Sequence, residues 1–258
     1  ELGDILSEFQ LPLEWYSGLT TDGEFLYLTE SRGNEPGLLY VVSIAEERVV
    51  AEYEIQSWCF SIEFDGENLW IATFNSPEIR IYTRDGDQIG QFNAEQVSTY
   101  SMASDQTEFV YMKKINNPIY VYSIADREFV GTINHQPGFN NDAEVAYIMC
   151  APSQADGSIW GFARNHGYRA RINGNRLENV QQFNFNEMII WSDVAHDGEN
   201  IWYSNRGLAT CMDDGIMDIR PDWLSVEPTD GVIAPGNQVD LTFTLNPAGC
   251  EEGEVLET

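Results

Sequence analysis

A recurring turn motif is the feature that most constrains the fold of this chain. Each copy begins with an Asp, followed by Gly in four of five copies, and leads into a short apolar run with an aromatic residue. The five copies begin at Asp22, Asp65, Asp105, Asp156 and Asp197. By subtraction of these numbers, they are 43, 40, 51 and 41 residues apart. Such a period indicates a repeat fold, in which neighbouring units bury each other's apolar faces.

Each copy predicts four short strands. The first strand has a small or polar middle residue, as at Gly18, Ser61 and Ser101, which suits a crowded central axis. The turn Gly takes a positive φ at little steric cost. The third strand alternates with period two, as at residues 79–82 and 119–122. With no sustained helical period, the plan predicts an all-β fold, a five-bladed β-propeller.

The fifth copy lacks a fourth strand of its own, because the chain turns away after residue 212. The N-terminal residues 4–11 resemble a fourth strand that belongs to none of the other copies. We therefore expect them to complete the last blade and close the ring, which removes exposed sheet edges. The predicted propeller domain is 1–218.

The last 40 residues, 219–258, differ from the repeats. Residues 223–236 follow the pattern Trp-Leu-Ser-Val-x-Pro-x-x-Gly-x-x-x-Pro-Gly, and residues 239–245 alternate. This pattern resembles the start of BACON-like, immunoglobulin-like domains of secreted bacterial proteins, which often follow propellers with Asp-Gly-x-x-Leu-Trp repeats. The resemblance implies an extracellular or cell-surface protein with a partial immunoglobulin-like module. A full sandwich needs about 100 residues, so the remaining strands either follow the given sequence or come from another subunit.

The charge excludes several partners. Asp and Glu number 42 against 13 Lys and Arg, for a net charge of −29. Such a surface repels nucleic acid and anionic lipid. No run of 18 apolar residues predicts insertion into a membrane.

The four cysteines leave the redox state open. An even number in a secreted chain permits disulfides, and Cys211 with Cys250 would join the propeller to the tail. Cys59 and Cys150 lie on predicted inner strands, where two buried free thiols are the alternative. The chain has no CxxC motif, so the sequence does not predict a zinc site.

Calcium is the one metal ion that the sequence suggests. Two turns gather carboxylates, at Asp85 with Asp87 and at Asp213 with Asp214. Asp is common in turns without any metal, and the EF-hand pattern is missing. We expect no other cofactor.

Polar residues on the first strands are candidates for a site at the mouth of the central channel. They are Ser17, Ser61, Ser101 and Asp193. The alternative is that small residues there satisfy steric demands alone. No Gly-x-Ser-x-Gly motif indicates a hydrolytic triad, and His196, directly before a turn, is expected at the surface.

The tryptophans fall into two groups. Trp70, Trp160 and Trp202 recur at one place in the repeat, which predicts core positions. Another three precede first strands near one face of the ring: Trp15, Trp58 and Trp191. This second group predicts either a stacking platform for sugar or packing between blades.

The first copy also resembles the bacterial and plant-type glutaminyl cyclotransferases, which are similar five-bladed propellers. The resemblance lies in residues 16–19 and 26–31, and it implies that Glu30 matches a catalytic glutamate. The later copies lack the Trp- and Glu-bearing inner strands of that family, so catalysis is not the favoured prediction.

The sequence favours a non-enzymatic extracellular structural or adhesive protein. Its expected partners are copies of itself, assembled into a filament or surface layer through residues 219–258, or a cell-surface or glycan ligand. The alternative is a propeller that binds or converts a glycan or peptide at the channel mouth.

Overall fold

The computed structural model describes residues 3–95, 99–114, 117–134, 147–150, 158–163, 166–184, 193–214, 224–227 and 242–245. The chain forms two compact units, Glu1–Gly215 and Ile216–Thr258. Among the described residues, no helix is long and apolar enough to cross a membrane.

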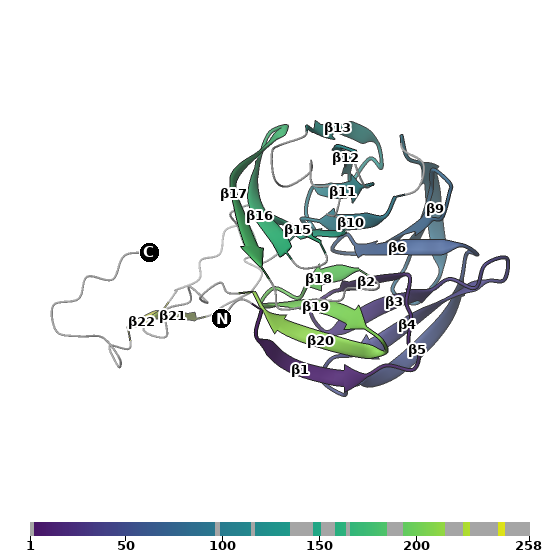
Figure 1. Cartoon of the computed structure of the whole chain (residues 1–258), viewed down its shortest axis with the longest axis horizontal. Helices are drawn as coiled ribbons and strands as arrows, with labels where there is room; N and C mark the ends of the chain where they lie inside the picture. The colour runs from purple at the N-terminus through teal and green to yellow at the C-terminus, as the bar shows by residue number, and fades with distance from the viewer. Residues whose placement is uncertain are drawn as a thin grey trace, which may run out of the picture. The chain divides into compact units, whose positions relative to one another are not determined.

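The larger unit consists of five four-stranded antiparallel sheets (Figure 1). The first sheet contains β2 (Gly18–Thr21), β3 (Phe25–Glu30), β4 (Gly37–Ser43) and β5 (Arg48–Ile55). The second contains β6 (Cys59–Phe64), β7 (Leu69–Thr73), β8 (Glu78–Tyr82) and β9 (Gln88–Asn93). The third contains β10 (Ser101–Ser104), β11 (Phe109–Lys113), β12 (Ile119–Ser123) and β13 (Phe129–Ile133).

The other two sheets follow the same order from the axis outward. The fourth contains β14 (Tyr147–Cys150), β15 (Ser158–Phe162), β16 (His166–Asn173) and β17 (Arg176–Asn184). The fifth contains β18 (Val194–His196), β19 (Asn200–Asn205), β20 (Leu208–Asp213) and, as its outer strand, β1 (Ile5–Gln10). Thus the segment expected to supply a fourth strand to this sheet pairs antiparallel with β20.

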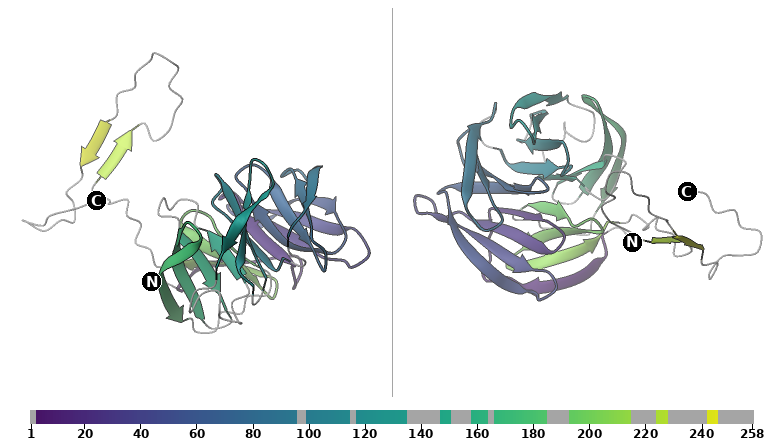
Figure 2. Two further views of the ribbon diagram at one scale, coloured as in Figure 1. Left: turned by 90° about the horizontal axis from the view of Figure 1, so that it is seen from above. Right: turned by 180° about the vertical axis from the view of Figure 1, so that it is seen from behind.

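The five sheets form a ring around a central axis. The innermost strands contact one another in the order β2, β6, β10, β14 and β18, and β18 contacts β2 again. Figure 2 shows the same ring from above and from behind. The predicted all-β, five-bladed propeller is therefore confirmed.

The apolar core lies between sheets. Trp70 of β7 packs with Val110 and Met112 of the third sheet, whereas the next residue, Ile71, packs with Tyr27 of the first sheet. Successive residues of a strand face opposite sides, so each middle strand serves both neighbouring sheets. Burying a side chain of this size contributes about 1.5–3 kcal/mol. The predicted core position of Trp70 is confirmed by its exposure of 0%.

The recurring Asp organises the turns after the inner strands β2, β6, β10 and β18, whereas Asp156 lies outside the described residues. In the second sheet, Asp65 Oδ1 accepts the backbone N–H groups of Glu67 (2.8 Å) and Asn68 (2.6 Å). Asp65 Oδ2 accepts the indole N–H of Trp70 at 2.6 Å. One carboxylate thus fixes both the turn and the buried aromatic side chain that follows. This pairing explains why three of the five copies place an Asp five residues before the aromatic residue, at Asp22, Asp65 and Asp197.

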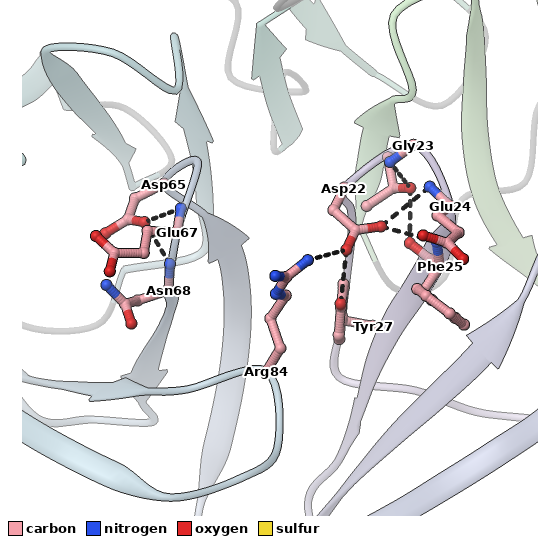
Figure 3. A network of polar contacts seen from close by, with 10 residues as sticks. Asp22, Gly23, Glu24, Phe25, Tyr27, Asp65, Glu67, Asn68 and Arg84 are labelled. Atoms are coloured by element: carbon pink, nitrogen blue, oxygen red, sulfur yellow. Dashed lines mark hydrogen bonds and ion pairs between the residues drawn. The ribbon is translucent and has the colours of Figure 1, made fainter. Parts of the chain in front are cut away.

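The same arrangement recurs around the ring. Asp22 accepts the Tyr27 hydroxyl at 2.8 Å, and Asp197 accepts the Trp202 indole at 2.6 Å. Figure 3 shows the Asp22 and Asp65 turns, with Arg84 of the second sheet reaching Asp22 at 3.1 Å. That ion pair joins two neighbouring blades, although its half-exposed Arg limits its contribution to at most about 1 kcal/mol.

The turn glycines have the predicted positive φ. Gly23, Gly66 and Gly198 have φ of 90°, 101° and 105°. In the third copy Gln106 takes the place of the glycine. Its φ of 57° is a left-handed backbone conformation, which is energetically unfavourable for a residue with a Cβ atom.

The smaller unit contains β21 (Leu224–Glu227) and β22 (Thr242–Leu245), which pair antiparallel. The rest of the predicted immunoglobulin-like module lies outside the described residues.

Candidate functional site

The inner strands bring three of the predicted channel residues together. Asp193 accepts the Ser61 hydroxyl at Oδ2 (2.9 Å) and the Ser101 hydroxyl at Oδ1 (2.7 Å). The Val194 N–H also donates to Asp193 Oδ1, at 3.1 Å. All three side chains are 0% exposed. Asp193 of the fifth blade therefore bonds across the axis to the second and third blades.

Burial is the main influence on the Asp193 carboxyl, and it raises its pKa well above the ordinary range. The hydrogen bonds from Ser101, Ser61 and Val194 act in the opposite direction. Because a charge in such a place is poorly solvated, this carboxyl has the environment of a structural hydrogen-bond acceptor between blades.

A second buried carboxyl lies nearby on β6. Glu63 accepts the Thr20 hydroxyl at 3.3 Å, and Thr20 Oγ1 also accepts the backbone N–H of Phe64 at 3.2 Å. Burial, and then repulsion by Asp193, raise the pKa of Glu63 well above its usual value. No motif in the sequence predicts this contact, because Thr20 and Glu63 are 43 residues apart in the chain.

The remaining predicted channel residue, Ser17, is separate from this group. Its hydroxyl donates to the Thr29 backbone oxygen at 3.0 Å and lies 3.0 Å from Thr29 Oγ1. The next position has a steric requirement, since a Cβ on Gly18 would lie 2.8 Å from Ile62 N. The small residues at the axis thus serve hydrogen bonding and close packing, and a ligand site at the channel mouth stays a prediction.

The ring face where the inner strands begin carries a cluster of aromatic side chains. We define the aromatic cluster as Trp58, Phe60, Phe74 and Tyr100. Trp58 stacks on Phe74 with ring centroids 6.2 Å apart and planes at 21°. Phe60 lies 5.3 Å from both Phe74 and Tyr100. The cluster therefore joins the start of the inner strand β6 in the second blade to the residue that precedes the inner strand β10 in the third blade.

Trp58 is held in place although 42% of it is exposed. Its backbone N–H donates to Gly33 O (3.2 Å), and its backbone oxygen accepts from Phe74 N (2.7 Å). Its indole N–H donates to Asn34 Oδ1 at 3.1 Å. Its φ of 56° is an outlier for a bulky side chain. Such strain is maintained only where surrounding contacts enforce it, and it is concentrated at functional sites.

The other two tryptophans of this predicted group differ. Trp15 is 50% exposed, and Trp191 lies outside the described residues. Trp58 packs on Phe74 of its own blade and bonds to Asn34 of the first blade, and it keeps exposed surface, so its role as a stacking platform for sugar stays a prediction.

Glu30 ends β3 on the same face of the ring. Its carboxylate accepts the Tyr40 hydroxyl at 2.9 Å and lies 3.5 Å from Arg32 Nε. Its backbone oxygen accepts from Cys59 Sγ at 3.2 Å, next to Trp58 in the chain. The Glu30 side chain is 23% exposed, so it is oriented by protein groups and still reachable from solvent.

The turns suggested for calcium have other uses in the structure. Asp85 and Asp87 are exposed on the turn between β8 and β9, where Asp87 N donates to Thr83 Oγ1 at 3.1 Å. Asp213 pairs through its backbone with residues 3 and 4, and Asp214 lies 3.0 Å from His196 Nε2. Within the described ranges, no group of three or more His, Cys, Asp and Glu side chains is placed to hold a metal ion.

The prediction of a surface His196 is wrong. His196 is 3% exposed, and its Nδ1 accepts the Gly198 N–H at 3.0 Å. A neutral ring therefore carries its proton on Nε2 and donates it to Asp214. His196 occupies the position of Thr21, whose hydroxyl likewise accepts the N–H of its turn glycine. His196 is buried because it ends the inner strand β18, from where its ring accepts the N–H of the turn glycine.

Three cysteines are free and buried: Cys59, Cys150 and Cys211. Burial raises the pKa of the Cys59 and Cys211 thiols to about 12 and that of Cys150 well above its usual value. Cys250 lies outside the described residues, so its disulfide with Cys211 stays a prediction.

Comparison with known proteins supports the fold class. Neither the protein-family models nor the curated protein sequences that were searched match the chain. Among solved structures, a Myxococcus xanthus glutaminyl cyclase is similar over 81% of this chain and 94% of its own, with 10% identity and a TM-score of 0.61. Kuenenia stuttgartiensis hydrazine synthase matches 75% of this chain and 56% of its own, with 15% identity and a TM-score of 0.50. At these identities the likeness shows a shared propeller fold.

Proposed function

We propose that this protein is a non-enzymatic extracellular binding propeller whose ligand contacts the aromatic cluster. One observation carries the proposal: Trp58 is rigidly held in a strained conformation while 42% of it remains exposed. A pre-oriented aromatic surface loses little conformational entropy when a ligand packs on it. The extracellular setting rests on the resemblance of residues 223–236 to secreted proteins.

The buried carboxyls at the axis are not placed for catalysis, which favours a binding function over an enzymatic one. Asp193 and Glu63 are at most 7% exposed and accept hydrogen bonds from protein hydroxyls. A general acid or base must reach the proton that it transfers. These two side chains are enclosed, so we assign them to joining the blades.

Fluorine NMR on protein labelled with 5-fluorotryptophan tests the proposal. Trp58→Phe identifies one resonance, and Trp70→Phe identifies a buried reference. We expect at least one compound in a panel of neutral hexasaccharides and of cationic, anionic and apolar peptides to shift the Trp58 resonance and leave Trp70 unchanged. If no compound shifts Trp58 at millimolar concentration, the proposal fails.

A second candidate is cyclotransferase activity through Glu30. It is favoured by the partial exposure of the oriented Glu30 carboxylate and by the fold shared with a glutaminyl cyclase. In that reaction the α-amine of an N-terminal glutamine attacks its side-chain amide and releases ammonia. Ammonia release from a glutaminyl peptide, abolished in Glu30→Gln, would establish this activity and overturn the non-enzymatic reading.

Self-assembly through residues 219–258 also stays a prediction. Electron microscopy of the full chain and of a chain ending at residue 218 tests it. Filaments or rings formed by the full chain alone would support assembly, and monomers in both samples would contradict it.

A further inference from the structure

The polar groups beside the aromatic cluster narrow the class of ligand. We infer that the surface formed by Trp58 and Asn34 binds a neutral oligosaccharide. This inference rests on the proposed function, since it specifies the ligand of the same site. Asn34 lies in the loop before β4 and Trp58 directly precedes β6, and the bond from the Trp58 indole N–H to Asn34 Oδ1 holds the two side chains together.

Their hydrogen bonds determine what each residue offers to a ligand. Asn34 is exposed and uses Oδ1 to accept the Trp58 indole N–H, which leaves its Nδ2 group as the donor. A sugar hydroxyl accepts as well as donates, so it can accept a hydrogen bond from this amide.

Trp58 provides the apolar part of the surface. Its ring is fixed by the stack on Phe74 and by the bond to Asn34. A sugar ring has an apolar face formed by its C–H groups and a rim of hydroxyls. It therefore matches a fixed aromatic side chain bordered by an amide donor. Large aromatic side chains bury much apolar surface when a ligand binds, and they contribute a disproportionate share of the binding free energy.

The charge of the chain restricts the sugar to a neutral one. With a net charge of −29, the protein repels uronic acids and sulfated or phosphorylated glycans. A cationic peptide is the competing ligand, because ammonium groups also stack on Trp. Asn34 favours the saccharide because its available Nδ2 group is a hydrogen-bond donor. Such a donor pairs with the oxygen of a sugar hydroxyl and not with a cation.

Two substitutions separate these ligands. Trp58→Ala removes the stacking surface. Asn34→Asp keeps an oxygen for the Trp58 indole and replaces the amide donor by a carboxylate. Phe129→Ala is the matched control, because Phe129 is also 42% exposed and lies on the outer strand β13. Thermal unfolding of each variant checks that it remains folded.

Isothermal titration with cellohexaose, laminarihexaose and N-acetylated chitohexaose tests the inference. We expect at least one to bind the native protein, with affinity about tenfold or more weaker in Trp58→Ala, several-fold weaker in Asn34→Asp and unchanged in Phe129→Ala. Failure of all three to bind at 5 mM (roughly the millimolar range of weak ligands), or binding unaffected by Trp58→Ala, overturns the inference. A lysine-rich peptide whose binding needs Trp58 and strengthens in Asn34→Asp would overturn it while leaving the proposed function intact. If neither class binds at Trp58, both fail.

Discussion

The bond between Asp65 and Trp70 predicts a measurable energetic coupling. Asp65 Oδ2 accepts the Trp70 indole N–H at 2.6 Å, and the two residues are 6% and 0% exposed. A buried hydrogen bond to a charged group is worth about 1.5–3 kcal/mol. Asp65→Asn keeps an oxygen for the backbone N–H groups of Glu67 and Asn68 but turns an amide N–H toward the indole. Two donors then face each other in a buried site.

A double-mutant cycle isolates this bond. Trp70→Phe removes the indole donor, so Asp65→Asn should cost less in that background than in the native protein. We expect a coupling of about 1.5–3 kcal/mol in the free energy of unfolding, measured by urea denaturation. As a control, Asp197→Asn with Trp70→Phe lies in two different sheets and should be additive within about 0.5 kcal/mol. A coupling below about 0.5 kcal/mol for the Asp65 pair would show that the repeated Asp serves the turn alone.

Three further predictions concern other positions. Gln106→Gly should raise the free energy of unfolding by about 1 kcal/mol, because it relieves a positive φ; a lower melting temperature would contradict this. The raised pKa of Asp193 means that the folded state holds a proton that the unfolded chain has lost. Native stability should therefore decrease as pH rises from about 4 through the folded pKa, by about 1.4 kcal/mol per unit of separation, and the decrease should be smaller in Asp193→Asn. Equal pH dependence of the two proteins in urea titrations would refute this role. With thiol pKa values of about 12, Cys59 and Cys211 should react with Ellman's reagent at pH 8 at least about 100-fold more slowly in native Cys250→Ser protein than in urea, and fast native labelling would contradict their burial.

The repeat made the fold predictable because each blade is specified locally. The Asp, the turn glycine and the aromatic residue lie within six residues of one another, and the bond between the Asp and the aromatic residue forms inside that segment. A periodic sequence therefore revealed the number of blades and the core position of Trp70.

The contacts at the axis were less predictable. Asp193 is separated by 132 residues from Ser61 and by 92 from Ser101, so their meeting depends on the closed ring. The burial of His196 had a sequence signal, its alignment with Thr21 and Ser104, but a histidine before a turn was interpreted as a surface residue. The strain at Trp58 has no sequence signal, because it arises from contacts with Gly33, Asn34 and Phe74.

The pairing of β1 with β20 has a consequence for biosynthesis. β1 is synthesised well before its register partners, which run from Leu208 to Met212. At synthesis rates of about 5–20 residues per second, β1 waits about 10–40 s for this partner. During that time Ile5 and Leu6, which are 57% and 53% exposed even in the finished fold, form an unpaired apolar edge strand. The nascent chain is therefore most open to mispairing with another chain just before its last blade emerges.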